Sequence, residues 1–142
     1  MALWLLRLTA WVTTLTEMKL LMLGAGGHAR VLQEILEEAG HGLAGFVAPQ
    51  MSEVSLKGEL RHYTDEEVFR DLSRDEYLVI NGVGSARMAD LRWKVSQFYE
   101  GEGFHFLQIQ AQTSHVSASA TLLGGVQVMH KAVVHSDAYL EE

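Results

Sequence analysis

The sequence predicts an α/β domain built on a parallel sheet, followed by the start of a triangular parallel β-helix. Three observations predict this fold. Apolar runs alternate with helix-like segments up to about residue 112, a glycine-rich turn follows the first run, and a six-residue aliphatic spacing then begins. We therefore divide the chain into an N-terminal extension (1–17), a binding domain (18–112) and an incomplete β-helix (113–142).

The binding domain contains four predicted strands. Residues 19–23, 43–48 and 77–81 are short apolar runs typical of buried parallel strands, and residues 104–109 alternate as a fourth. Helices are expected between them. The first repeats apolar side chains at helical spacing through Val31, Leu32, Ile35, Leu36 and Ala39.

Two further helices have recognisable starts. Thr64 and Glu67 form a capping-box pattern that begins a short helix. Ser85 can cap a third helix. Its buried face is predicted to hold Met88, Leu91, Val95 and Phe98.

The β-helix prediction depends on a strict repeat. Aliphatic residues recur every six positions at Val116, Leu122, Val128, Val134 and Leu140. A small residue stands four positions after each of the first four, at Ala120, Val126, Ala132 and Ala138. Each hexad would form one side of a triangular coil, so we expect one turn and a fraction.

Composition excludes several classes of protein. The 142 residues carry 18 acidic and 11 basic side chains, a net charge of −7 that disfavours nucleic-acid binding, and no cysteine for a disulfide or thiolate site. No apolar run is long enough to span a membrane, and residues 1–12 make a poor export signal, so we expect a cytoplasmic protein.

A phosphate-binding turn is the first candidate site, at Gly24, Ala25, Gly26, Gly27, His28 and Ala29. Gly24 permits a tight turn, Gly26 lets backbone approach a diphosphate, and Ala29 allows close helix packing. The alternative is a turn that needs glycine only for its geometry. His28 either touches the ligand or caps the turn.

A second loop holds Gly82, Gly84, Ser85 and Arg87. It follows another parallel strand, so both loops should lie at one sheet edge and form a crevice. Arg87 either binds a phosphate or carboxylate, or is solvated. The second predicted strand ends at Ala48-Pro49 without the acidic residue that dinucleotide enzymes use, which disfavours NAD or NADP. The spacing of His130 and His135 matches no usual metal site, so no metal is expected.

From Met18 onward, the two glycine loops followed by hexads through Gly125-Val126-Gln127-Val128-Met129 resemble the sialic acid O-acetyltransferase-like and UDP-4-amino-sugar N-acetyltransferase family. The resemblance implies a Rossmann-like domain that holds a UDP- or CMP-linked sugar. It also implies a left-handed β-helix that holds acetyl-CoA, and a homotrimer. Substrate contacts are implied at both loops.

The resemblance implies no catalytic residue within these 142 residues, because the family's catalytic histidine follows an Asn-Thr-Gly segment that is not present. We therefore expect the substrate-binding domain of an acyltransferase, inactive alone. One alternative is a non-enzymatic nucleotide-sugar-binding or interaction module. A dinucleotide-dependent oxidoreductase is the other.

Overall fold

The computed structural model describes residues 17–49, 53–85 and 89–141. Arg87, Met88 and most of the expected N-terminal extension lie outside these ranges. The binding domain contains, in chain order, β1 (Lys19–Leu23), α2 (Gly27–Glu38), β2 (Leu43–Val47), β3 (Arg61–Tyr63), α3 (Asp65–Asp71), β4 (Tyr77–Asn81), α4 (Ala89–Gly101) and β5 (His105–Phe106). The coil contains β6 (Ile109–Gln110), β7 (His115–Val116), β8 (Thr121–Leu122), β9 (Gln127–Val128), β10 (Val133–Val134) and β11 (Tyr139–Leu140).

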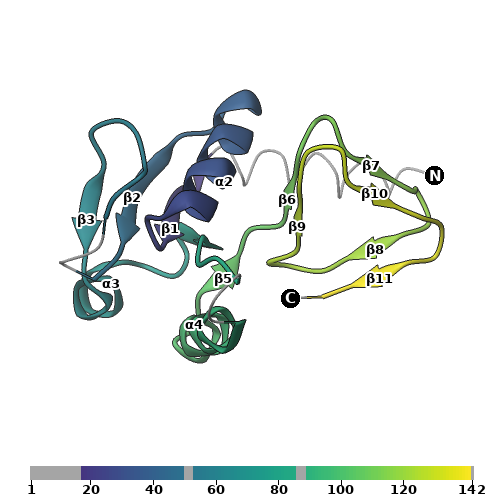
Figure 1. Cartoon of the computed structure of the whole chain (residues 1–142). Helices are drawn as coiled ribbons and strands as arrows, with labels where there is room; N and C mark the ends of the chain where they lie inside the picture. The colour runs from purple at the N-terminus through teal and green to yellow at the C-terminus, as the bar shows by residue number, and fades with distance from the viewer. Residues whose placement is uncertain (1–16, 50–52, 86–88, 142) are drawn as a thin grey trace.

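The sheet of the binding domain has five parallel strands in the order β3-β2-β1-β4-β5. Its two faces carry separate apolar cores. Leu20 and Met22 of β1 pack with Leu32 of α2 on one face, while Leu21 packs with Val68 of α3 and residues of α4 on the other. The domain is therefore a three-layer α/β sandwich, and among the described helices only α2 lies on the coil side (Figure 1).

Strand β3 was not predicted from the sequence. It spans only three residues, and Arg61 and His62 are exposed while Tyr63 is buried. The segment has no apolar run because it forms the edge of the sheet, where only one side chain reaches the core.

The predicted buried face of α4 was wrong in part. Leu91 and Phe98 are 39% and 52% exposed, whereas Ser96 and Tyr99 are each 2% exposed. Ser96 lies on the buried face, where its Oγ accepts a hydrogen bond from the buried Asn81 amide at 2.8 Å. A polar contact of this kind has no signature in apolar spacing.

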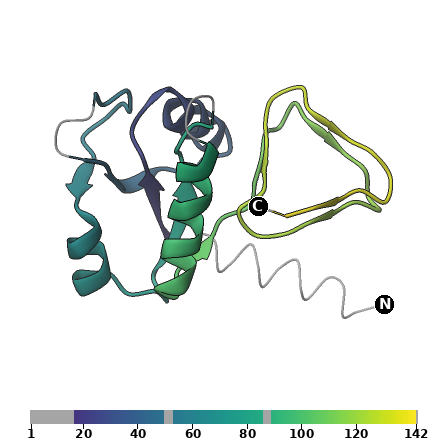
Figure 2. The same ribbon diagram turned by 60° about the horizontal axis from the view of Figure 1, so that its bottom comes forward.

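The predicted fourth strand, residues 104–109, is divided between two sheets. β5 pairs with β4, whereas β6 pairs with β9 across one turn of the coil. Each of the first three coil strands, β6, β7 and β8, lies beside the strand 18 residues later, and the coil is triangular in cross-section (Figure 2). Three hexads therefore make one turn, as the repeat predicts.

The coil has six strands in two layers and begins with β6, a strand ahead of residue 113, where we expected it to start. Gln110 holds the hexad position six residues before Val116 and pairs with Val128, but it is polar and exposed. The first strand of the coil was missed because this position lacks the aliphatic side chain on which the repeat was recognised.

The capping box of α3 forms as predicted. Thr64 Oγ1 accepts a hydrogen bond from the Glu67 backbone N–H at 3.3 Å, and the Glu67 carboxylate accepts one from the Thr64 N–H at 2.8 Å. The second bond lowers the pKa of Glu67. We expect Thr64→Ala to lower the free energy of unfolding by about 1 kcal/mol in a denaturant titration, and Thr64→Ser to lower it far less. Equal losses would contradict a capping role.

Candidate functional site

The candidate site lies where β1 and β4 run side by side in the middle of the sheet. The chain leads from β1 outward to β2 and β3, then returns to β4 and continues outward to β5 on the other side. Parallel sheets bind ligands at such a reversal, in a crevice outside the carboxyl ends of the two central strands. Both predicted glycine loops begin there, after Leu23 and after Asn81.

The two loops touch through their backbones. Gly82 N–H donates to Leu23 O at 2.7 Å, and Gly24 N–H donates to Val47 O at 2.7 Å. Gly24 has a φ of +93°, and a Cβ built on it would lie 3.2 Å from the Gly82 carbonyl carbon. Glycine is therefore required at Gly24 both for its backbone conformation and for this close approach.

Gly82 is enclosed more tightly than Gly24. A Cβ at this position would lie 2.6 Å from Met22 Sδ, 2.8 Å from Ala29 Cβ and 2.8 Å from Leu23 O. Ala25 and Ala29 are 3% and 0% exposed, so their side chains belong to the core. A ligand could therefore reach these two alanines only through their backbones.

The start of α2 is open to a ligand. Gly26 is the N-cap residue and no side chain caps the helix, whose first turn contains no acidic residue. A Cβ at Gly26 or Gly27 would find no atom of the described part of the chain within 4 Å. Free backbone N–H groups and the positive end of the helix dipole favour an anion at this point.

His28 faces the second loop and the coil. A Cβ at Gly84 would lie 3.6 Å from His28 Cβ. His28 Nε2 lies 2.9 Å from Gln127 Oε1 on β9, and Gln127 Nε2 donates to Asn81 O at 2.8 Å. The prediction from sequence missed Asn81 and Gln127; a polar residue ending the apolar run of β4 was the only available signal for Asn81.

The second loop is held by an arginine that we did not predict. Arg92 Nη1 donates to Asn81 O at 3.0 Å and to Val83 O at 3.1 Å. Ser85 is exposed at the end of the described part of this loop. Arg87, the predicted anion ligand, lies outside the described residues.

Within the described ranges, no group of three or more histidine, aspartate or glutamate side chains is arranged to hold a metal ion. The described helices include none with the length and apolar character of a membrane span. Dinucleotide enzymes place an acidic residue after the second strand of the sheet. This chain has Ala48 at that point, and its backbone O lies 2.7 Å from His62 Nε2.

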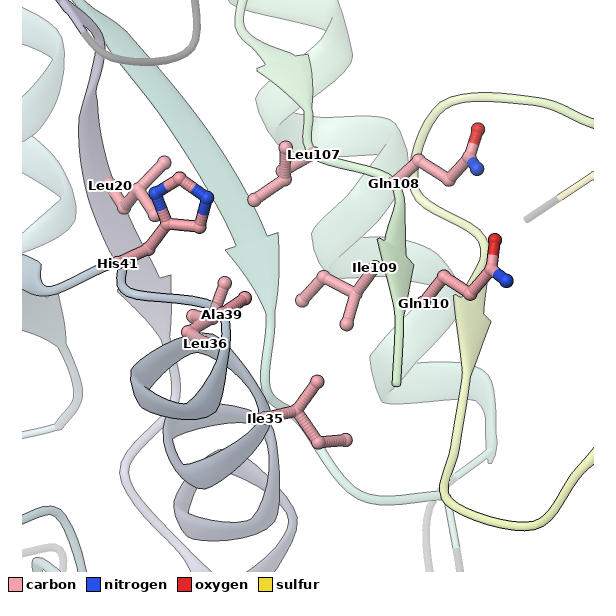
Figure 3. Close-up of a pocket in the computed structure, with 9 residues that line it drawn as sticks. All are labelled: Leu20, Ile35, Leu36, Ala39, His41, Leu107, Gln108, Ile109 and Gln110. Carbon is pink, nitrogen blue, oxygen red and sulfur yellow. The ribbon is translucent and has the colours of Figure 1, made fainter. Parts of the chain in front are cut away.

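A cavity of about 160 Å³ lies apart from the two loops (Figure 3). It is lined by Leu20 of β1, the end of α2 and Leu107 to Gln110. Leu20 belongs to the amino-terminal half of β1, whereas the glycine loops follow the carboxyl ends of the strands. The cavity is therefore not part of the crevice.

The sequence model of one protein family, the PglD N-terminal domain, matches residues 19–97, which is more than half of the chain. The chain belongs to the PglD N-terminal domain family. The resemblance seen in the sequence to sugar acetyltransferases is thereby confirmed for the N-terminal part. No curated protein matches the chain significantly.

Solved structures match this chain over a longer range that includes the coil. PerB from Caulobacter crescentus, in complex with CoA and GDP-perosamine, is 24% identical with a TM-score of 0.72, over 86% of this chain and 56% of that one. The acetyltransferase domain of PglB from Neisseria gonorrhoeae FA1090, in complex with acetyl coenzyme A, is 26% identical with a TM-score of 0.71, over 87% and 58%.

The chain therefore spans a little more than half the length of the structures that it matches. The predicted fold, a Rossmann-like domain followed by the start of a left-handed β-helix, is confirmed.

Proposed function

We propose that this chain binds a nucleotide-linked amino sugar and serves as the substrate-binding part of an acetyl-CoA-dependent sugar N-acetyltransferase. The observation that carries the proposal is the meeting of the two glycine loops at the start of α2. Two glycine loops on neighbouring strands meet beside an uncapped helix start, and a coil strand contacts the same place through Gln127. The CoA, GDP-perosamine and acetyl coenzyme A held by the structural neighbours support it.

The residues of the crevice have distinct roles in this proposal. The N–H groups of Gly27 and His28 bind the diphosphate, which a chain of charge −7 can attract only locally. Gly24 and Gly82 keep the backbone close enough for the two loops to meet. Gly84 and Ser85 border the sugar side, and Arg87 is a further candidate for the diphosphate.

Acetyl-CoA would supply the acetyl group. In the transfer, the sugar amine forms a bond to the acetyl carbonyl carbon, the thioester C–S bond breaks, and a base takes the amine proton. We assign binding and orientation of the sugar nucleotide to the described residues, and no base.

Assembly and location are part of the same proposal. Val133 and Tyr139 lie on the coil and are 56% and 61% exposed. We infer that these outward apolar side chains are covered in a homotrimer, and that the protein acts in the cytoplasm, where acetyl-CoA and nucleotide sugars are made. Light scattering coupled to size exclusion tests the trimer.

Calorimetric titration tests the ligand class. We expect micromolar to millimolar binding of one of three sugar nucleotides: GDP-perosamine, a UDP-linked 4-amino sugar or CMP-linked sialic acid. NAD serves as the control. Tight binding of NAD without a response to any sugar nucleotide would show that the crevice belongs to an oxidoreductase instead.

A further inference from the structure

Gln127 joins three parts of the molecule at the edge of the crevice. It lies on β9 of the coil, its Oε1 is 2.9 Å from His28 Nε2 on α2, and its Nε2 is 2.8 Å from the backbone O of Asn81 at the end of β4. His28 and Gln127 are 99 residues apart in the chain. A half-buried side chain therefore links the coil directly to the proposed substrate site.

The chemistry of these contacts fixes the direction of both hydrogen bonds. The Asn81 carbonyl oxygen can only accept, so it must face the amide NH₂ of Gln127. With the amide turned the other way, two acceptor oxygens would lie 2.8 Å apart. Gln127 therefore presents its Oε1 to His28, and His28 Nε2 must carry a proton to donate to it.

The fixed proton on Nε2 determines what His28 can offer a ligand. In the neutral ring the other nitrogen, Nδ1, is then a hydrogen-bond acceptor. It has no partner among the described residues of the chain. The His28 side chain lies beside the second glycine loop, since a Cβ built on Gly84 would be 3.6 Å from His28 Cβ.

We propose that Gln127 is a positioning residue that holds neutral His28 in its Nε2–H tautomer, so that Nδ1 accepts a hydrogen bond from a hydroxyl or amine of the bound sugar nucleotide. The ligand part of this inference rests on the proposed function. The coil thus contributes to substrate recognition by orienting His28, and Gln127 itself does not touch the ligand.

Nitrogen-15 NMR of the ligand-free chain at pH 8 tests the tautomer. We expect His28 to show a protonated Nε2 and an unprotonated Nδ1, with an Nε2–H signal protected from solvent exchange. Gln127→Met keeps the length of the side chain but removes both amide contacts. In this variant the protected signal should disappear and the Nδ1–H tautomer should become measurable.

Gln112→Met is the matched control, because Gln112 Nε2 also links the coil to α2, donating to Glu38 O at 3.0 Å, but it is far along the helix from His28. This variant should leave the His28 signals unchanged. The proposal is overturned if wild-type His28 carries its proton on Nδ1, if Gln127→Met leaves its signals unchanged, or if both variants alter them equally.

A binding measurement completes the test. The sugar nucleotide that binds the wild type should bind Gln127→Met about fivefold to tenfold more weakly and Gln112→Met with unchanged affinity, because one positioned hydrogen bond is lost. Unchanged affinity in Gln127→Met would overturn the ligand part. If no sugar nucleotide binds the wild type, the proposed function fails, and the ligand-free spectra still decide whether Gln127 fixes His28.

Discussion

Gly82→Ala should destabilise the fold strongly. The added methyl group would lie 2.8 Å from Ala29 Cβ and 2.8 Å from Leu23 O, and both belong to the packed β1–α2 unit rather than to mobile side-chain ends. Met22 Sδ, at 2.6 Å, could move, but the other two could yield only by separating the helix from the strand. We expect a loss of about 3 kcal/mol in unfolding free energy.

For a chain of this length, that loss corresponds to a fall in Tm of roughly 10 °C in a calorimetric scan. The control is Gly84→Ala in the same loop, where His28 Cβ, at 3.6 Å, is the only atom of the described residues that the new methyl group would meet. Its Tm should change by no more than about 2 °C. Similar losses in both variants would show that the loop is sensitive to any side chain and that the close approach at Gly82 is unimportant.

Gly26→Asp should abolish most nucleotide binding while leaving the fold intact. Gly26 has extended backbone angles (φ −84°, ψ −162°), which suit a capping aspartate, and there is open space around it. The carboxylate would occupy the free N–H groups of α2 and repel a diphosphate. We expect affinity to fall roughly 50-fold, with unfolding free energy unchanged or slightly raised.

Gly26→Asn separates charge from capping. Its amide can cap the same N–H groups but carries no charge, so it should bind the sugar nucleotide about tenfold more tightly than the aspartate variant. Calorimetric titration measures both affinities, and circular dichroism checks the fold. If the two variants bind equally weakly, charge repulsion plays no part and the phosphate does not lie at the start of α2.

The first strand, its glycine turn and α2 were predictable because each depends on residues close in sequence. The apolar run of β1 ends at Gly24, and the positive φ there needs glycine whatever follows. The proximity of the two glycine loops also followed from sequence, since parallel strands place their carboxyl ends at one edge. Its tightest contact, at Gly82, depends on the pairing of β1 with β4 and was visible only in the structure.

The link between the coil and the crevice was not predictable. Gln127 stands at an outward position of a hexad, where any polar residue is compatible with the repeat, and its two partners are 46 and 99 residues away. The first coil strand was missed for a related reason. The repeat is recognised by aliphatic residues at inward positions, and β6 has Gln110 at that position. Hydrophobic periodicity thus located the elements but not the polar contacts between them.

The central claim is that the two glycine loops bind a nucleotide-linked sugar, and mapping of backbone amide signals tests it most directly. During titration of the isotope-labelled chain with GDP-perosamine, a UDP-linked 4-amino sugar or CMP-linked sialic acid, we expect the N–H signals of Gly27, His28, Ala29 and Gly84 to move together and saturate. Signals that move instead around His41 and Ile109, or that stay unchanged with all three ligands, would contradict it.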